Sequence, residues 1–301
     1  MKLSKDVKLA LDDVRALMLG SQILLGFQFQ LPFQTAFSQV SIPERHLEFI
    51  VLLLLLVTIA LLIAPGSFHR IVEHGNASAR ILKIANLCST LMLPVFCIAL
   101  AADLFVAFKY AIGPRSAAGM FAFTALLAVA AAITPWLRRN AKVTDMHQVE
   151  VPPLPKRIEF VLTEARVILP GAQALLGFQL VIIFSNSFTE LLASEKIIHG
   201  VALGLITGAT LLLMAPAAIH RIAYDSQENP RFVVYAGALL SAATLLLAIG
   251  IAVEVRFIGN LLMDSTASAL LASLVSASLL IGVWHVWPMM LRLGETAGPT
   301  D

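Results

Sequence analysis

The sequence predicts an all-α integral membrane protein with eight transmembrane helices, arranged as two parallel four-helix repeats. Composition, apolar segment lengths and an internal repeat lead to this prediction. Hydrophobic residues make up 58% of the 301 residues and charged residues 13%, against about 45–50% and about 25% in soluble domains. Such a composition excludes a soluble enzyme, a disordered chain and a disulfide-stapled secreted domain. The formal net charge of +2 gives no electrostatic reason to expect nucleic acid as a partner.

Eight segments of the chain contain no aspartate, glutamate, lysine or arginine. A membrane-spanning helix needs about 20 mostly apolar residues, and each segment is close to that length or longer. An even number of spans places both termini on the same side. The segments are 16–43, 49–68, 84–102, 116–137, 167–189, 197–220, 232–253 and 265–291.

The distribution of lysine and arginine between these segments predicts the orientation. With the N-terminus inside, the inner segments hold 16 of these residues and the outer segments hold 5. Cytoplasmic loops carry the excess of lysine and arginine. We therefore expect a multi-pass protein of the bacterial inner membrane with both termini in the cytoplasm.

The two halves of the chain align without a gap when one is shifted by 151 residues. Arg15 then meets Arg166, Leu24–Gln28 meets Leu175–Gln179, and the His-Arg-Ile sequence at 69–71 recurs at 220–222. Each half holds four spans, so the repeats share one orientation across the membrane. We expect a first repeat at 1–137, a cytoplasmic linker with an amphipathic lead-in at 138–165, and a second repeat at 166–301.

A short amphipathic segment precedes the first span of each half. Apolar residues recur with helical spacing over 7–14 and over 158–165. We expect each segment to form a helix along the cytoplasmic interface. The alternative is one long helix that continues into the span.

The first two spans of the second half resemble a known family. The stretches Glu164–Val167 and Leu169–Gln179, together with Ala215–Arg221 at the end of the next span, are similar to DUF6328. That bacterial family consists of short four-span membrane proteins of uncharacterised function. The resemblance extends over nearly all of both halves and implies two such units fused in one chain. It implies a fold and a membrane location, and no established activity.

Glutamines in the first span of each half are the first candidates for function. Gln22 and Gln28 correspond to Gln173 and Gln179. An amide that faced lipid would lose its hydrogen bonds to water, so these groups should face other helices or a hydrated cavity. One interpretation is that they hold neighbouring helices together. The other is that they line a polar path between the halves, with Gln28 and Gln179 reaching toward a second helix.

Asp103 and Glu254 are the acids that correspond in the two halves. A carboxylate within a span suggests coupling to protons or cations. Asp103 follows Lys83 by a helix length of about 30 Å, which places both acids near the outer interface. There they form either a wetted interfacial pair or the outer vestibule of a path.

A Pro-x-x-x-His-Arg motif ends the second span of each half. Its residues are Pro65, His69 and Arg70 in the first half, and Pro216, His220 and Arg221 in the second. The motif is typical of a basic anchor at the cytoplasmic face. A pH-sensitive gate and a contact with anionic lipid headgroups are the alternatives.

Motifs for enzymatic, cofactor or metal chemistry do not occur in the sequence. It has no phosphate-binding glycine loop, no His-Glu-x-x-His zinc motif and no nucleophile elbow. We therefore expect no catalytic residue, no metal site, no cofactor and no enzymatic activity. The leading hypothesis is a transporter or channel for a small ion or solute, and the alternative is a membrane scaffold or accessory subunit. The bilayer is the expected partner, with anionic lipid at the cytoplasmic face, and a homo-oligomer stays open.

Overall fold

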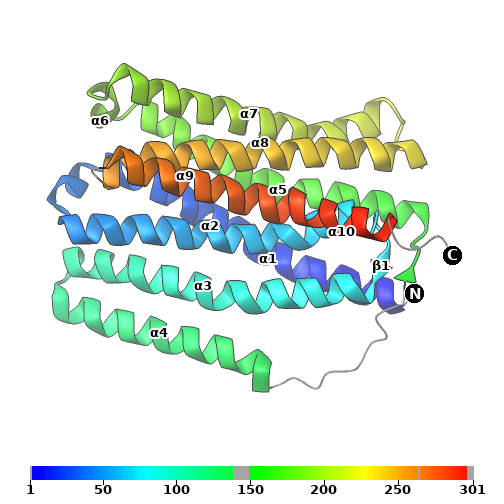
Figure 1. Cartoon of the computed structure of the whole chain (residues 1–301), viewed down its shortest axis with the longest axis horizontal. Coiled ribbons are helices and arrows are strands. Elements are labelled where there is room, and N and C mark those ends of the chain that lie inside the picture. Colours follow the sequence, from blue (N-terminus) through cyan, green and yellow to red (C-terminus); the bar gives the residue numbers. More distant parts are fainter. Residues whose placement is uncertain (1, 138–148, 264, 297–301) are drawn as a thin grey trace.

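The computed structural model of the chain is a bundle of long helices that run along one common direction (Figure 1). It describes residues 2–137, 149–263 and 265–296. Within these ranges, seven helices are long and apolar enough to cross a membrane. The helix at 114–137 is not among the seven. The part of the predicted linker at 138–148 lies outside the described residues.

The first half begins with one long helix, two short 3-10 turns and three more long helices. Pro32 lies in the first 3-10 turn, where its missing N–H and fixed φ favour the end of the preceding helix. The predicted segment at 16–43 is therefore a helix only as far as Gln30. The elements are α1 (Lys2–Gln30), η1 (Leu31–Phe33), η2 (Thr35–Gln39), α2 (Ile42–Ile71), α3 (Ala79–Ala111) and α4 (Pro114–Leu137).

The second half follows the same order. A π-helix interrupts its last long helix, and a two-stranded antiparallel sheet joins the turn after α2 to the chain before α5. That sheet pairs β1 (Ala77–Ser78) with β2 (Val149–Glu150). The helices are α5 (Leu154–Ile183), α6 (Asn186–Thr189), α7 (Ala193–Ile222), α8 (Pro230–Leu262), α9 (Thr266–Ile281), η3 (Gly282–Val286) and α10 (Trp287–Thr296).

The two lead-in segments are continuous with their spans, as the first turns of α1 and α5. The prediction of separate interfacial helices is therefore wrong. The apolar stripe of the first lead-in is covered by protein, because Val7 and Leu11 are buried with Phe68 and Ile81 at the ends of α2 and α3. A stripe that packs on neighbouring helices has no need to lie on the membrane surface.

The beginning of α1 and the end of α10 lie at the same end of the bundle (Figure 1). We call it the terminal end, and the other the opposite end. The turns after α2 and α7 both lie at the terminal end and have matching backbones. His74 and Asp225 have φ of 51° and 48°, and Gly75 and Ser226 follow with φ of 82° and 57°. Corresponding sequence positions thus adopt the same uncommon left-handed conformation.

The halves contact each other chiefly through α1 and α5. Phe27 and Phe178, which correspond in the repeat, meet with their ring centroids 4.6 Å apart. Lys8 and Glu159, which also correspond, form an ion pair at 2.6 Å. Gly26 permits the close approach, because a Cβ there would lie 2.1 Å from Cδ2 of Phe178.

The last helices of the two halves are placed differently. The indole of Trp284 in η3 is fully buried and donates a hydrogen bond to the Ala60 carbonyl of α2 at 3.0 Å. The end of the second half thereby packs against the first half. In contrast, α4 lies at the edge of the bundle beside α3 (Figure 1).

Candidate functional site

A polar cluster lies between α1, α2 and α3 near the opposite end. The Gln28 amide nitrogen donates to a Glu48 carboxylate oxygen at 3.2 Å and to an Asp103 carboxylate oxygen at 3.1 Å. Gln28 and Glu48 are buried, and Asp103 is half-buried. One amide therefore holds two carboxylates close to each other. We call these three residues the first cluster.

A second cluster occupies the corresponding place between α5, α7 and α8. The Gln179 amide nitrogen donates to Glu254 at 2.9 Å. Nδ1 of His199 lies 3.1 and 3.2 Å from the two carboxylate oxygens of Glu254, and its Nε2 lies 3.1 Å from the backbone carbonyl oxygen of Gln179. All three side chains are fully buried. These three residues are the second cluster.

The two clusters are related by the shift of 151 residues, member by member. The structure brings together four residues that the sequence had selected, namely Gln28 with Asp103 and Gln179 with Glu254. Sequence reasoning missed the third pair, Glu48 and His199. The signal was present, since the same shift superimposes these two positions. A carboxylate and an imidazole are neither identical nor similar, so residue similarity between the halves does not select this position.

The charge balance of the first cluster depends on its two acids, Glu48 and Asp103. Among the described residues, no lysine, arginine or histidine nitrogen forms an ion pair with Glu48 or Asp103. Adjacent carboxylates in a poorly solvated site cannot both stay ionised without compensation. The arrangement therefore calls for a shared proton or a bound cation. The described residues contain no group of three or more His, Cys, Asp and Glu that could hold a metal ion.

The second cluster supplies its own cationic partner. A backbone carbonyl only accepts hydrogen bonds, so Nε2 of His199 donates to the Gln179 carbonyl. The Nδ1 atom then faces the Glu254 carboxylate, so a hydrogen bond between these two groups requires a proton on one of them. The rings of Phe188 and Phe257 pack on the imidazole, with centroids 5.4 and 4.9 Å away. This pair therefore holds one proton in an apolar enclosure.

The burial of Glu254 differs from the prediction of a wetted interfacial acid. Its carboxylate is fully enclosed because α8 contacts both α5 and α7, where Gln179 donates to one carboxylate oxygen and Nδ1 of His199 lies within 3.2 Å of both. Asp103, on the less enclosed α3, is only half-buried. The two acids do not form one vestibule, since each belongs to the cluster of its own half.

The other two glutamines lie away from the clusters. Gln22 is fully buried at the contact of α1 with α5, and neither atom of its amide has a hydrogen-bond partner. Its amide oxygen lies only 1.6 Å from where a Cβ of Gly171 would be, so position 171 must be glycine for this side chain to fit. Gln173 is exposed. Of the four glutamines expected to line a path between the halves, the structure places only Gln22 there.

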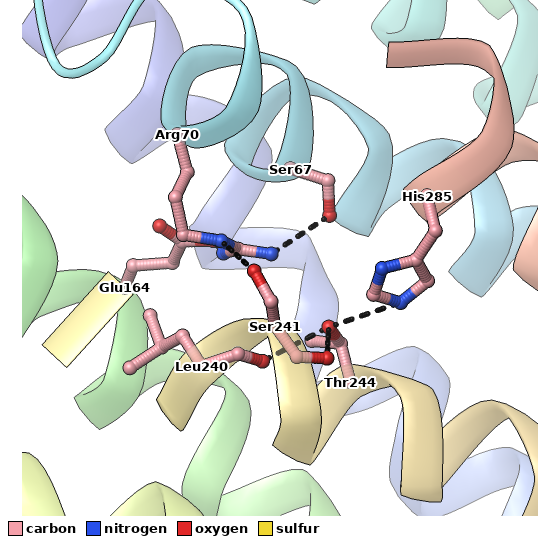
Figure 2. A network of polar contacts seen from close by, with 7 residues as sticks. All are labelled: Ser67, Arg70, Glu164, Leu240, Ser241, Thr244 and His285. Atoms are coloured by element: carbon pink, nitrogen blue, oxygen red, sulfur yellow. Dashed lines mark hydrogen bonds and ion pairs between the residues drawn. The ribbon is translucent and has the colours of Figure 1, made fainter. Parts of the chain in front are cut away.

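The Pro-x-x-x-His-Arg motif of the first half lies at the terminal end, inside the contact between the halves. Arg70 of α2 forms an ion pair with Glu164 of α5, and both side chains are buried. Its Nε also donates to the Ser241 hydroxyl of α8 at 3.1 Å (Figure 2). His69 is buried and packs edge-on against Phe160. Arg70 is thus a buried link between the halves, and not the exposed anchor that the sequence suggested.

The same motif in the second half remains at the surface. His220 is half-buried and packs on Phe232, with ring centroids 4.7 Å apart, and Arg221 is exposed. Pro216 is buried within α7, as Pro65 is within α2. Figure 2 also shows Thr244 beside the buried network, where its hydroxyl lies 3.3 Å from Nε2 of His285. Corresponding residues therefore differ in their partners at this end.

The comparison with protein-family models agrees with the repeat seen in the fold. The model of DUF6328, a family of unknown function, matches residues 2–137 and again residues 154–288. The chain belongs to the DUF6328 family. The two matches are consistent with a tandem duplication, and each DUF6328 copy contains one polar cluster. The second match begins at residue 154, so it includes the lead-in that is continuous with α5. No curated protein and no solved structure matches the chain.

Proposed function

We propose that this protein is a non-enzymatic transporter of the bacterial inner membrane for protons or another small monovalent cation. The proposal takes α4 as the eighth span, since a helix of 24 residues extends about 36 Å and exceeds the hydrocarbon thickness of about 30 Å. The excess of lysine and arginine supports a cytoplasmic terminal end. The clusters then lie toward the outer side of the membrane.

The observation that carries the proposal is the pair of carboxylates in the first cluster. Glu48 and Asp103 share a single amide donor and have no basic partner among the described residues. Carboxylate oxygens are the ligands that hard cations prefer, and a proton can be shared between two such groups. Ionisable residues inside a membrane protein often mark an ion or proton pathway.

The second cluster supports the same function with a different charge balance. His199 stands where the first copy has Glu48, and its imidazole can hold the proton that balances Glu254. The first cluster must receive its compensating charge from outside. We expect the first cluster to bind the transported cation, and the second to retain or relay a proton.

The test is flux through purified protein reconstituted into liposomes that contain a pH-sensitive dye. Proton, sodium and potassium gradients are imposed in turn on the wild type and on Glu48→Gln with Asp103→Asn. We expect the double variant to lose flux by at least tenfold, the factor that corresponds to about 1.4 kcal/mol. Glu190→Gln is the matched control, because Glu190 is an exposed acid at the same end of the bundle. Equal flux in the double variant and the control would contradict the proposal.

A substitution that copies the second cluster into the first sharpens this test. Glu48→His would place an imidazole beside Asp103, as His199 lies beside Glu254. The cluster would then carry its own cationic partner, so we expect flux to fall while the protein stays folded. Undiminished flux in Glu48→His would show that the pair of carboxylates is not required.

A scaffold remains the second candidate, and one observation favours it. Every hydrogen bond within the clusters joins helices of the same DUF6328 copy, which is what interhelical polar contacts do in membrane bundles. A scaffold predicts no flux above empty liposomes and a large loss of stability in the cluster variants. A transporter predicts measurable wild-type flux that disappears in variants that still unfold cooperatively.

A further inference from the structure

A pocket of about 370 Å³ lies at the terminal end of the bundle, far along the helices from the polar clusters. It is formed by the end of α2 and the turn after it, the beginnings of α5 and α8, and α10. Its volume lies within the range of about 300–1,000 Å³ that is common for small-molecule sites. The charged residues and histidines of its lining are His69, Arg70, His74, Arg157, Glu164 and Arg292.

Positive charge exceeds negative charge in this lining, because three arginines face a single glutamate. That glutamate, Glu164, is already paired with Arg70. Among the described residues, no carboxylate forms an ion pair with Arg157 or Arg292. Within the part of the chain that the structure describes, two guanidinium groups therefore remain without a negative partner at the same pocket.

The Arg157 side chain is fixed in place and only partly used. Its Nη2 donates to the His74 carbonyl at 2.9 Å, which fixes the guanidinium against the turn after α2. Its Nε is buried and has no hydrogen-bond partner. A buried donor without an acceptor is costly, so a small turn of the guanidinium that brings this Nε to an acceptor of a ligand would remove that cost. Arg292 is exposed on α10 and is free to move toward the same ligand.

One wall of the pocket is apolar. It consists of Phe160 and Val161 of α5 and Val233 and Val234 of α8, and Val234 is 75% exposed. The lining therefore continues from the guanidinium groups onto the outer surface of the bundle. Such a boundary between basic and apolar groups suits an anion carried by an amphipathic molecule, because basic pockets between spans on the cytoplasmic side bind acidic headgroups.

We propose that this pocket binds a phosphate group, held by Arg157 and Arg292 at the contact between the two DUF6328 copies. Guanidinium donors match the oxygens of phosphate in geometry and charge, and often bind them with two parallel hydrogen bonds. The phosphate belongs either to the headgroup of an anionic lipid or to an anion free in the aqueous phase. Both sources present the same chemistry to the two arginines.

Native mass spectrometry of the purified full chain, supported by its thermal unfolding midpoint, tests this proposal. Three probes are titrated: inorganic phosphate, short-chain phosphatidylglycerol and short-chain phosphatidylcholine. For Arg157→Gln with Arg292→Gln we expect about tenfold weaker binding, the loss that about 1.4 kcal/mol produces. The matched control is Arg221→Gln with Arg231→Gln, which removes two exposed arginines from the same end but outside the pocket. The control should bind like the wild type.

The pattern of probes identifies the source of the phosphate. Binding of phosphatidylglycerol alone, lost in the pocket variant, assigns the site to a lipid headgroup. Binding of inorganic phosphate, lost in the same variant, assigns it to a free anion. If the pocket variant lacks a cooperative unfolding transition, the single Arg292→Gln variant replaces it, since that side chain is exposed and should be dispensable for folding. The proposal would be overturned if the pocket variant and the control variant bound these probes equally. It would also be overturned if the wild type bound neither inorganic phosphate nor phosphatidylglycerol more tightly than phosphatidylcholine.

Discussion

The two polar clusters occupy the same place in two copies of one family and balance their charges differently. In the first, the side-chain amide of Gln28 donates to two carboxylates. In the second, the side-chain amide of Gln179 donates to one carboxylate, and the backbone carbonyl of Gln179 accepts from a histidine. The backbone positions are conserved between the copies, while one residue, Glu48 or His199, decides whether the site needs a charge from outside. Duplication thus allowed one fold to hold both an incomplete and a complete charge arrangement.

The two copies also diverge at the terminal end. Arg70 and Glu164 form a buried ion pair across the contact between the halves. Their counterparts, Arg221 and Asp13, are both exposed. The buried ion pair beside the α1–α5 contact is therefore not repeated by the corresponding residues of the other copy.

The largest expected effect on stability comes from replacing Glu254 of the second cluster, and replacing the corresponding Asp103 of the first cluster should cost less. Glu254→Leu leaves the His199 and Gln179 side chains buried without their acceptor, so we expect a loss of about 3–5 kcal/mol. Asp103→Leu acts on a half-buried group with one amide partner, and we expect about 1–2 kcal/mol. Unfolding in mixed micelles with increasing denaturing detergent measures both. Equal losses would show that the clusters do not differ in this respect.

An added methyl group should have different effects at Gly26 of α1 and at the corresponding Gly177 of α5. Gly26→Ala would bring a Cβ to 2.1 Å from the Phe178 ring, and we expect a loss of about 1–3 kcal/mol from overpacking. Gly177→Ala is the matched variant, because no atom lies within 4 Å of a Cβ at that position. It should be neutral, or stabilising by up to about 1 kcal/mol through helix propensity. The same unfolding assay decides, and an equal effect of both would contradict the asymmetry.

The smallest expected effect concerns the ion pair between Lys8 and Glu159. Both side chains are about half exposed, so Lys8→Glu should cost less than about 1 kcal/mol. The double variant, Lys8→Glu with Glu159→Lys, should restore the wild-type midpoint because it reverses the pair. High salt should reduce the difference between the single variant and wild type. A double variant as unstable as the single one would indicate that the two charges do not interact.

The sequence was sufficient for the coarse architecture, because apolar length and repeat register are local properties of the chain. It predicted a multi-helix membrane fold, of which seven apolar helices are long enough to span a membrane among the described residues, together with the shift of 151 residues and four of the six cluster residues. It could not assign Glu48 or His199, since their role depends on which helices face Gln28 and Gln179 in space. The duplicated position alone could have drawn attention to them.

Contacts between the halves were beyond sequence reasoning for a related reason. The pairing of Arg70 with Glu164 depends on how α2 and α5 meet in space, which the sequence of neither segment specifies. The exposure of Gln173 and the burial of Gln22 follow from the same contact, because only Gln22 has a glycine, Gly171, opposite it. Hydrophobic pattern alone does not contain this information.

The ion pair between Lys8 and Glu159 also bears on why two units are joined in one chain. These residues hold the same position in the two copies and touch each other, so the position lies on the approximate twofold axis of the bundle. In a homodimer of identical four-helix chains, such a position would meet its own twin and could bring only like charges together. Fusion removes that restriction, because each copy can then evolve its own residue on the axis. Opposite charges there add a weak preference for the unlike partner over self-pairing of either copy, weak because both side chains are half exposed.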